Sequence, residues 1–225
     1  DNSGESVSMN ANGDRIAIGA PSNGGNFGHA RVYEWDGAAW VQLGLDIDGQ
    51  ANGDQSANSV SMNAAGDRLA IGARLHGSVT NYNDKRGNVR VYEWSGTAWV
   101  QLGLDIDGES VYDYSGHSVS MNAAGDRVAI GAVRNGGGGI GADFGHVRIY
   151  EWGGTAWMQL GLDIDGEAAG DFSGYSVSMN AVGDRVAIGA NQNDGNGTRS
   201  GHVRIYEWSG TAWVPLGVDI DGEAA

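Results

Sequence analysis

Aspartate pairs separated by one residue occur four times in this chain, each directly before a glycine. In the first occurrence Asp46 and Asp48 are followed by Asp54 in the next link. Aspartates at alternate positions of a strand point to one face, and a third carboxylate from the returning loop would complete an oxygen cage for Ca²⁺. If the chain closes into a ring, Asp1 completes the last set. The candidate ligands are Asp46, Asp48, Asp54, Asp105, Asp107, Asp113, Asp163, Asp165, Asp171, Asp219, Asp221 and Asp1.

A structural interpretation competes with the calcium one. Aspartates at strand ends hydrogen-bond their own turns, and their charge keeps sheet edges soluble. The links lack the EF-hand pattern, because glycine comes too early and no glutamate stands at the bidentate position. The sequence leaves both interpretations open, with Ca²⁺ as the one cofactor that it suggests.

The histidines do not form a catalytic set. His29, His146 and His202 stand at one repeat position, which Asn88 fills in the second repeat. A residue that recurs in most repeats is more often structural than catalytic. No nucleophile elbow, zinc-binding helix or phosphate loop is present in the sequence. We therefore expect that the protein is not an enzyme.

Tryptophans and arginines recur with equal regularity. Two tryptophans flank a short turn in every repeat, beginning with Trp35 and Trp40, so their rings should meet across two strands. Tryptophans also bind sugars, but their place in the repeated framework favours packing. An arginine lies two residues before each strand tyrosine, as Arg90 does before Tyr92, and is expected to stack on that ring.

These residues belong to four near-identical repeats of roughly sixty residues, a period typical of stacked repeat architectures. Each repeat holds four runs rich in Val, Ile, Tyr and Trp, bounded by Gly, Asn, Asp and Ser, as strands and turns are. In the fourth repeat the predicted strands are residues 176–180, 185–190, 202–208 and 212–220. Four antiparallel strands per repeat, joined by constant hairpins, predict an all-β fold, a β-propeller with four four-stranded blades.

The predicted domain is a single propeller over residues 1–225, with repeats at approximately 1–53, 54–112, 113–170 and 171–225. The chain starts and stops at the same phase of the repeat, so four blades could close into a ring. The alternative is part of a larger ring, completed by further repeats or a second chain. Because Asp1 stands where an initiator Met would, we expect a mature or excised segment.

Composition narrows the classes of partner. The formal net charge is −15, which argues against binding nucleic acid or anionic membranes. No apolar run approaches the length of a membrane span. The chain contains no Cys, so it has neither a disulfide framework nor a thiolate metal site.

The chain resembles the FG-GAP repeats of integrin α-subunit propellers and related bacterial and algal surface proteins. The matching residues are Gly19-Ala20-Pro21, the Gly-Ala pairs at 72, 131 and 189, and Ser173-Gly174-Tyr175-Ser176-Val177 where the family has Phe-Gly. The resemblance covers the whole chain and implies a propeller that places its variable loops and links on one partner-binding face. The family's calcium hairpin, an Asp-x-Asp-x-Asp-Gly-type turn, is replaced by Asn-Ala-Ala-Gly-Asp and its variants.

Only the second loop of each repeat varies in length, at residues 21–27, 74–86, 133–144 and 191–200. Such loops are where function is individualised. The candidate ligand-binding residues are His76, Tyr82, Lys85, Arg86, Arg134 and Phe144. We expect a secreted, non-enzymatic module of the adhesion type, extracellular or at the cell surface, which presents these loops to a protein or glycan partner. The alternatives are a self-associating structural subunit of an extracellular assembly and a carbohydrate-binding lectin.

Overall fold

A computed structural model describes residues 1–77, 84–136 and 142–223 of the chain. Strands dominate this part of the chain. The one helix found in it is the single turn α1 (Asn23–Asn26), which Gly24 and Gly25 interrupt with positive φ angles. No helix in the described ranges has the length and apolar character needed to cross a membrane.

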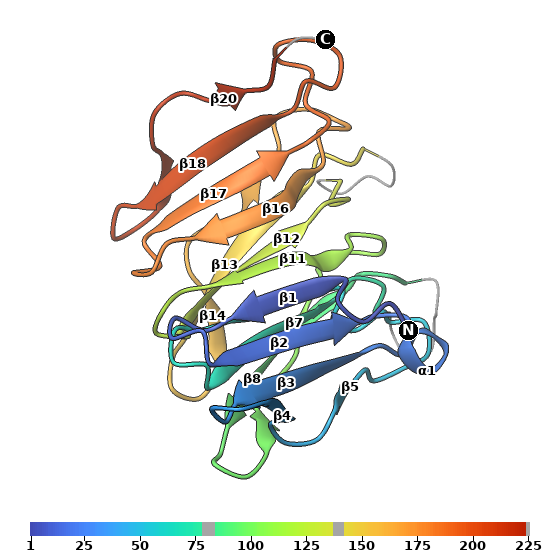
Figure 1. Cartoon of the computed structure of the whole chain (residues 1–225). Helices are drawn as coiled ribbons and strands as arrows, with labels where there is room; N and C mark the ends of the chain where they lie inside the picture. Colours follow the sequence, from blue (N-terminus) through green and yellow to red (C-terminus); the bar gives the residue numbers. More distant parts are fainter. Residues whose placement is uncertain (78–83, 137–141, 224–225) are drawn as a thin grey trace.

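Four antiparallel sheets form four blades, which confirms the predicted all-β propeller fold (Figure 1). Blade 1 contains β1 (Ser6–Met9), β2 (Arg15–Ala20), β3 (His29–Trp35), β4 (Trp40–Gln42) and β5 (Ile47–Asp48). Blade 2 contains β6 (Ser59–Met62), β7 (Arg68–Ala73), β8 (Asn88–Trp94), β9 (Trp99–Gln101) and β10 (Ile106–Asp107). Blade 3 contains β11 (Ser115–Met121), β12 (Arg127–Ala132), β13 (His146–Trp152), β14 (Trp157–Gln159) and β15 (Ile164–Asp165). Blade 4 contains β16 (Ser173–Met179), β17 (Arg185–Ala190), β18 (His202–Trp208), β19 (Trp213–Pro215) and β20 (Ile220–Asp221).

An asparagine holds the hairpin between the first two strands of each blade. In blade 2 the Oδ1 of Asn63 accepts hydrogen bonds from the backbone amides of Asp67 and Arg68 at 3.1 and 3.0 Å. Gly66 supplies the positive φ angle of +74° that this turn requires. The side chain of Asn63 and the backbone amides therefore close the turn.

The fourth predicted strand is split into two short strands that both pair with the third. In blade 2, β9 pairs with the end of β8 and β10 with its start. Gly103 lies between the two and takes a φ of +81°, which turns the chain outward. A Cβ atom on Gly103 would lie 2.8 Å from the ring of Trp152 in blade 3. The split therefore leaves room for the tryptophan pair of the following blade.

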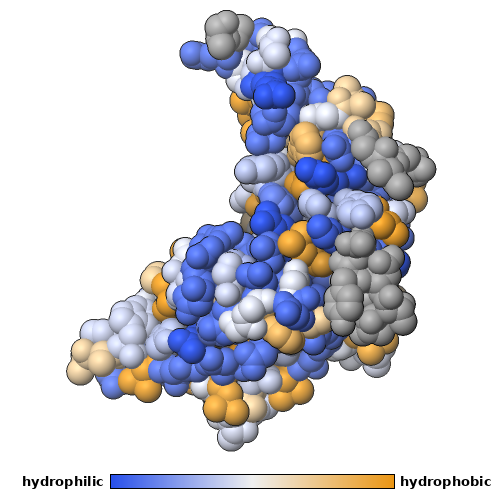
Figure 2. Space-filling model, turned by 90° about the vertical axis from the view of Figure 1, so that its right-hand side faces the viewer, coloured by the Kyte–Doolittle hydropathy of each residue, from blue (hydrophilic) through white to orange (hydrophobic). Residues whose placement is uncertain are grey.

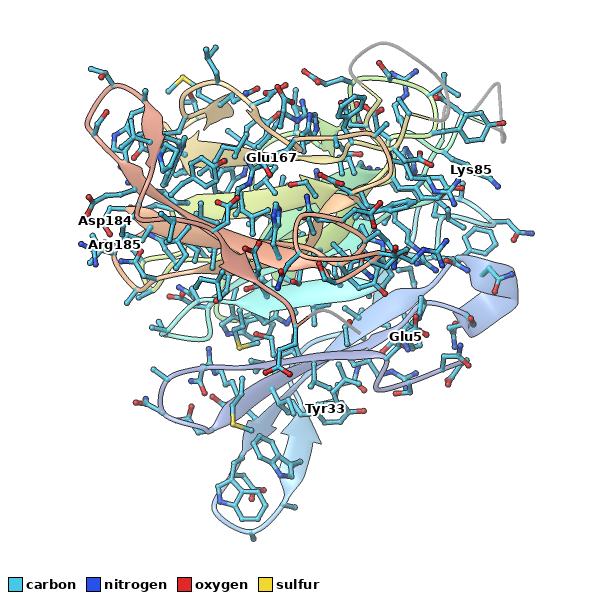
Figure 3. The ribbon with its side chains drawn as sticks, turned by 90° about the horizontal axis from the view of Figure 1, so that it is seen from above. Glu5, Tyr33, Lys85, Glu167, Asp184 and Arg185 are labelled. Atoms are coloured by element: carbon cyan, nitrogen blue, oxygen red, sulfur yellow. The ribbon has the colours of Figure 1, made fainter. Side chains whose placement is uncertain are left out.

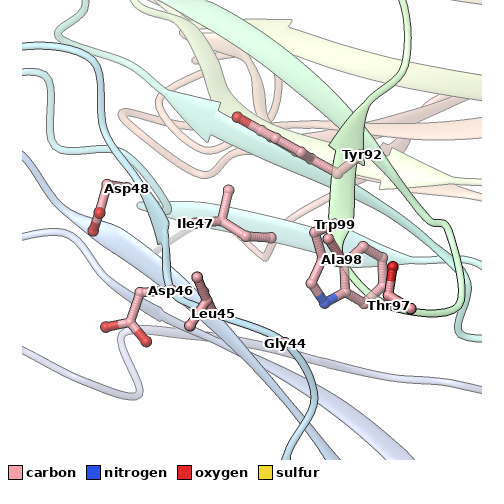
Figure 4. Close-up of a pocket in the computed structure, with 9 residues that line it drawn as sticks. All are labelled: Gly44, Leu45, Asp46, Ile47, Asp48, Tyr92, Thr97, Ala98 and Trp99. Carbon is pink, nitrogen blue, oxygen red and sulfur yellow. The ribbon is translucent and has the colours of Figure 1, made fainter.

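The hydrophobic core consists of three clusters, one at each junction between consecutive blades. At the second junction Val91 and Ile106 of blade 2 share a cluster with Met121 of blade 3. At the outer edge of the first junction a groove of about 630 Å³ lies between Gly44 of blade 1 and Trp99 of blade 2 (Figure 4). Each blade is therefore stabilised by its neighbours, as in other repeat proteins.

The four blades form an open arc (Figure 1, Figure 2). None of the hydrophobic clusters in the described residues joins blade 4 to blade 1. Val7 of blade 1 is 60% exposed and Ile220 of blade 4 is 57% exposed, whereas their equivalents Val60 and Ile106 are 8% and 5% exposed. Of the two arrangements that the sequence leaves open, the closed four-blade ring is not adopted.

Candidate ligand site on the loop-bearing face

The variable loops and the links between blades lie on the same side of the arc. Figure 2 faces this side, which is largely hydrophilic with separate apolar patches. Lys85, from a variable loop, lies on this side, and the hairpin residues Asp184 and Arg185 lie on the opposite one (Figure 3). Positions of the loop-bearing face at which the near-identical repeats differ are the places where binding can be specific.

One position of the links differs in every repeat. In blades 3 and 4 a bulge near the start of the first strand displaces two residues from the ladder, Gly116 and His117 or Gly174 and Tyr175. Bulges of this kind redirect side chains and are common beside functional sites. The same repeat position carries Glu5 in blade 1 and Asn58 in blade 2. A glutamate, an asparagine, a histidine and a tyrosine thus occupy one place in an otherwise near-identical framework.

Three of these residues and an arginine are directly connected. The Nδ2 of Asn58 donates to the carbonyl oxygen of His117 at 3.1 Å, and its Oδ1 accepts from the amide of Arg74 at 3.0 Å. The rings of His117 and Tyr175 have centroids 5.0 Å apart. We call Asn58, Arg74, His117 and Tyr175, together with the adjacent Arg134, the bulge site.

His117 is neutral at physiological pH. Burial lowers its pKa to about 4, with a further lowering from the charge of Arg74. Its Nδ1 is buried and has no hydrogen-bond partner among the described residues. In the described part of the chain no carboxylate pairs with this imidazole, in contrast to His76, which lies 3.0 Å from Asp54.

Arg134 lies over two aromatic rings. Its guanidinium carbon is 5.0 Å from the ring centroid of Tyr114 and 6.0 Å from that of Phe172. Both aromatic residues adopt a φ of +55°, a left-handed conformation that costs about 1–2 kcal/mol for a residue with a side chain. The amide of His117 donates to the carbonyl oxygen of Tyr114 at 3.2 Å, which connects this stack to the rest of the bulge site.

The two arginines of the bulge site are not neutralised by carboxylates. Arg74 donates to the neutral amide oxygen of Gln55 at 3.2 and 3.0 Å, and neither Arg74 nor Arg134 forms an ion pair among the described residues. By contrast, the framework arginine Arg68 pairs with Glu93 at 2.8 Å. The bulge site is therefore locally positive in a chain whose net charge is −15.

Of the six loop residues predicted from sequence, Arg134 lies in the bulge site. His76 and Arg86 are engaged instead in loop-holding ion pairs, His76 with Asp54 at 3.0 Å and Arg86 with Asp84 at 2.8 Å. The hydrogen bond that the Nδ1 of His76 donates to Asp54 raises the pKa of His76.

The remaining predicted loop residues have other positions. The carbonyl oxygens of Lys85 and Phe144 accept hydrogen bonds from the amides of Tyr114 and Ser173 at 3.3 and 2.9 Å, so their backbone anchors the links. Tyr82 lies outside the described residues. Sequence reasoning missed Arg74, His117 and Tyr175, because it compared loop lengths and did not compare residue types at a fixed repeat position.

The structure separates the third aspartate of each candidate calcium set from the first two. Its carboxylate accepts the backbone amide three residues earlier, at 2.8 Å for Asp54, 2.7 Å for Asp113 and 3.0 Å for Asp171. Asp1 similarly accepts the amide of Ser3 at 3.1 Å. No group of three close histidine or acidic ligands in the described part of the chain includes any of these four. They hold turns, as the structural interpretation expects.

The first aspartate of each pair has protein partners as well. Asp46 accepts two hydrogen bonds from Arg31 at 3.0 and 2.8 Å, and this contact lowers the pKa of Asp46. Asp105 accepts from Asn88 at 3.1 Å and Asp163 from Gln159 at 2.6 Å. Asp219 lies 3.8 Å from the Nδ1 of His202.

The second aspartate of each pair acts through its backbone. The carbonyl oxygens of Asp48, Asp107 and Asp165 accept hydrogen bonds from arginines of the following blade at 2.9, 2.8 and 2.6 Å. Burial raises the pKa of Asp107 and Asp165, and the neighbouring aspartate raises each further. Asp221 is the equivalent residue at the end of blade 4, where no blade follows in the arc.

Three groups bring a histidine close to two carboxylates, namely His29 with Asp46 and Asp48, His146 with Glu109 and Asp163, and His202 with Glu167 and Asp219. The Nδ1 of His146 is 3.6 Å from Asp163, whereas its Nε2 is buried without a partner. A cation on Nδ1 would force the proton onto this unpartnered Nε2, against the usual requirement for a second-shell acceptor. Arg148 lies 3.5 Å from Glu109 and supplies the positive charge. The residues around His146 therefore do not fit a cation site.

The tryptophan prediction agrees with the geometry in all four blades and the arginine prediction in blades 2 to 4, whereas Arg31 of blade 1 binds Asp46. The tryptophan rings of each blade meet with centroids 5.4–5.6 Å apart. Arg90, Arg148 and Arg204 lie 5.5–5.6 Å from the rings of Tyr92, Tyr150 and Tyr206. These groups form the framework of the junctions and leave the bulge site as the candidate ligand site.

No protein-family model and no curated protein matches the sequence. Solved structures match the fold. The periplasmic gluconolactonase PpgL of Pseudomonas aeruginosa is 14% identical with a TM-score of 0.62, over 98% of this chain and 57% of that one. A putative 6-phosphogluconolactonase from Bacteroides uniformis is 9% identical with a TM-score of 0.64, over 97% and 55%. The β-propeller domain of the Trilobed protease from Pyrococcus furiosus is 9% identical with a TM-score of 0.50, over 94% and 56%.

These matches establish the propeller fold, and this chain spans about half the length of each of the three structures. They overturn the expectation of an adhesion-type module, together with its alternatives of an extracellular structural subunit and a lectin, because gluconolactonases are among the similar structures. The reason for the error is physical. The Gly-Ala strand ends and hairpins that suggested adhesion are features of blade packing, and a fold does not determine function.

Proposed function

We propose that this chain binds a small anionic ligand at the bulge site. The observation that carries the proposal is the presence of two arginines without carboxylate partners, Arg74 and Arg134, at the place where near-identical repeats differ. A guanidinium group pairs with carboxylate or phosphate through two parallel hydrogen bonds. Tyr175, which is 48% exposed, adds a ring against which a ligand can pack.

Binding without turnover is part of this proposal. A histidine whose pKa is about 4 is a weak general base at neutral pH, and the unpartnered Nδ1 of His117 leaves it without an orienting group. Hydrolysis of a sugar-acid lactone is the second candidate function. The names of three similar structures favour it, and a sugar acid or its phosphate is also the kind of anion that the arginines would recognise.

We also propose that the protein is exported from the cytoplasm, to the periplasm or the cell exterior. One of the similar structures is described as periplasmic. The absence of Cys is compatible with an oxidising compartment but does not require one.

Calorimetric titration with gluconate, 6-phosphogluconate and inorganic phosphate tests the binding proposal, with neutral glucose as the control ligand. We expect one of the anions to bind and glucose to give no heat. Arg134→Gln should weaken binding by about tenfold or more, the loss expected for a charge-assisted contact. Arg199→Gln, which changes an exposed loop arginine of blade 4, is the matched control and should leave affinity unchanged. The proposal fails if no anion binds, or if both variants bind as the wild type does.

A second assay separates binding from catalysis. The rate of δ-gluconolactone hydrolysis with the protein should equal the rate in buffer alone. A faster rate that disappears in His117→Asn, the residue type found at this position in blade 2, would instead favour the lactonase candidate.

A further inference from the structure

The two ends of the arc expose opposite halves of one interface. We call the side of a blade that contacts the preceding blade its first face and the side that contacts the following blade its second face. Each interior junction packs the second face of one blade against the first face of the next. On the first face, Met9 of blade 1 is 52% exposed, while the equivalent Met62 and Met121 are 6% and 7% exposed. On the second face, Ile220 of blade 4 is 57% exposed, while the equivalent Ile164 is 5% exposed. The end faces thus have the residues of a junction but lack a partner.

The interior junctions share a set of hydrogen bonds as well as apolar contacts. A tryptophan Nε1 donates to a leucine carbonyl of the preceding blade at 2.9, 2.9 and 2.8 Å, in the pairs Trp99–Leu43, Trp157–Leu102 and Trp213–Leu160. A serine Oγ donates to a link carbonyl of the following blade at 2.9, 2.8 and 2.7 Å, in the pairs Ser6–Ala57, Ser59–Gly116 and Ser118–Gly174. An arginine Nη1 donates to the carbonyl oxygen of a turn glycine in the following blade at 3.1, 3.1 and 3.0 Å, in the pairs Arg15–Gly66, Arg68–Gly125 and Arg127–Gly183.

Among the described residues, the tryptophan and serine bonds each leave one unpaired group at each end of the arc. Trp40 and the link carbonyl of Gly4 are the unused groups of blade 1, and Leu216 and Ser176 are those of blade 4. Gly44, Gly103 and Gly161 each lie against the tryptophans of the following blade, whereas a Cβ on the equivalent Gly217 would meet nothing within 4 Å. The groups missing from one end are therefore those present at the other.

Arg31 of blade 1 also lacks the partner in a preceding blade that its equivalents have. Its equivalents Arg90, Arg148 and Arg204 donate an Nη2 to an aspartate carbonyl of the preceding blade. Arg31 has no preceding blade and pairs instead with Asp46 of its own blade at 2.8 Å. The backbone carbonyl of Asp221 at the other end is the acceptor that a following blade would use.

Blade 4 also has an open cavity of about 350 Å³ at this face, lined by residues that include Ser176, Gly189, Gly201 and Asp221. At the interior junctions the link of the next blade fills the equivalent space. Gly87 and Gly145 form bridges to Ser115 and Ser173 of the following blade. The equivalent of these serines in blade 1 is Ser3. Residues 1–6 of another copy are therefore the equivalent of the link that fills this space at an interior junction.

We propose that the blade 1 face of one copy docks on the blade 4 face of a second copy, head to tail, by the contacts of an interior junction. The arc matches about half of larger propeller structures over 97% or 98% of its own length. Two copies joined head to tail at both ends form a ring with two equivalent interfaces, which leaves neither end face exposed. The occupant of each end face is thus a second copy of this chain.

The test measures mass in solution by sedimentation velocity over a roughly hundredfold range of protein concentration. The wild-type chain should be a dimer that dissociates on dilution. Met9→Asp places a charge in the apolar part of the blade 1 face, and Ile220→Asp does so in the blade 4 face. Each variant alone should therefore be a monomer. Their mixture should form a 1:1 complex, because each variant supplies the face that the other lacks. Leu104→Asp, at a rim position that is 85% exposed, is the matched control and should remain a dimer.

Each other outcome counts against the proposal. A wild-type chain that is monomeric at every concentration overturns it, and an assembly that grows beyond two copies overturns the closed ring. An Ile220→Asp variant that still dimerises overturns the head-to-tail arrangement, as does a mixture that does not combine. Circular dichroism of both variants establishes that they are folded, and the mixing experiment stays decisive because it uses the intact face of each.

Discussion

The exposure of the end blades predicts a large difference between two substitutions of identical sequence context. Ile164 and Ile220 both stand in an Asp-Ile-Asp-Gly segment, but the first is 5% exposed and the second 57% exposed. Truncating a buried isoleucine to alanine costs about 2–5 kcal/mol, from lost burial and the cavity left behind. We expect Ile164→Ala to lie in this range. Ile220→Ala loses little burial and should cost about 1 kcal/mol or less.

Urea unfolding followed by tryptophan fluorescence measures this difference, at a concentration low enough for the chain to be monomeric. The unfolding slope should be compared between variants, because a repeat array can unfold in steps and the free energies are comparable only if the slope is unchanged. Equal losses of stability in the two variants would refute the assignment of Ile220 to an unpartnered face. At high concentration Ile220→Ala should become more destabilising, as the docking proposal requires.

Three further predictions follow from single residues. Gly103→Ala should be much more destabilising than Gly217→Ala. Both glycines have positive φ, but only a Cβ at position 103 meets a tryptophan ring, at 2.8 Å. Thermal melts in which both variants lose the same amount of stability would contradict this. The hydrogen bond that His76 donates to Asp54 raises the folded-state pKa of His76. The stability that this bond contributes is therefore complete below an ordinary histidine pKa of about 6.5 and is lost as the pH rises through the raised value. His76→Asn, the residue type found in blades 3 and 4, should flatten this part of the pH profile of stability, and an unchanged profile would remove the assignment. NMR titration should give His117 a pKa of about 4, and Arg74→Gln should raise it; a value near 6.5 would mean that the imidazole is not buried.

Much of the blade was predictable from the repeat, because strand pattern and turn chemistry are local. The predicted strands 185–190 and 202–208 coincide with β17 (Arg185–Ala190) and β18 (His202–Trp208). The predicted strand 212–220 is two strands, because Gly217 turns the chain outward with a φ of +86° between them. In the preceding blades the equivalent glycine makes room for a tryptophan about fifty residues further on, as Gly103 and Trp152 show, and no local pattern reveals this.

The closure of the ring was not predictable for a different reason. Matching termini establish the phase of a repeat but not the angle between consecutive blades, which the side chains at the junctions set. The bulge site was also hidden. His117 and Tyr175 occupy one repeat position, and comparing residue types there would have identified them, but their contacts with each other and with Asn58 depend on how consecutive links converge.

Hydrogen exchange of four equivalent indole N–H groups tests the open arc and its complementary ends most directly. Trp99, Trp157 and Trp213 donate to leucine carbonyls of the preceding blade and should be protected at every concentration. Trp40 should exchange freely in dilute solution and gain protection as the concentration rises. Protection of Trp40 in the most dilute sample would contradict the open arc, and free exchange at all concentrations would contradict the pairing of its ends.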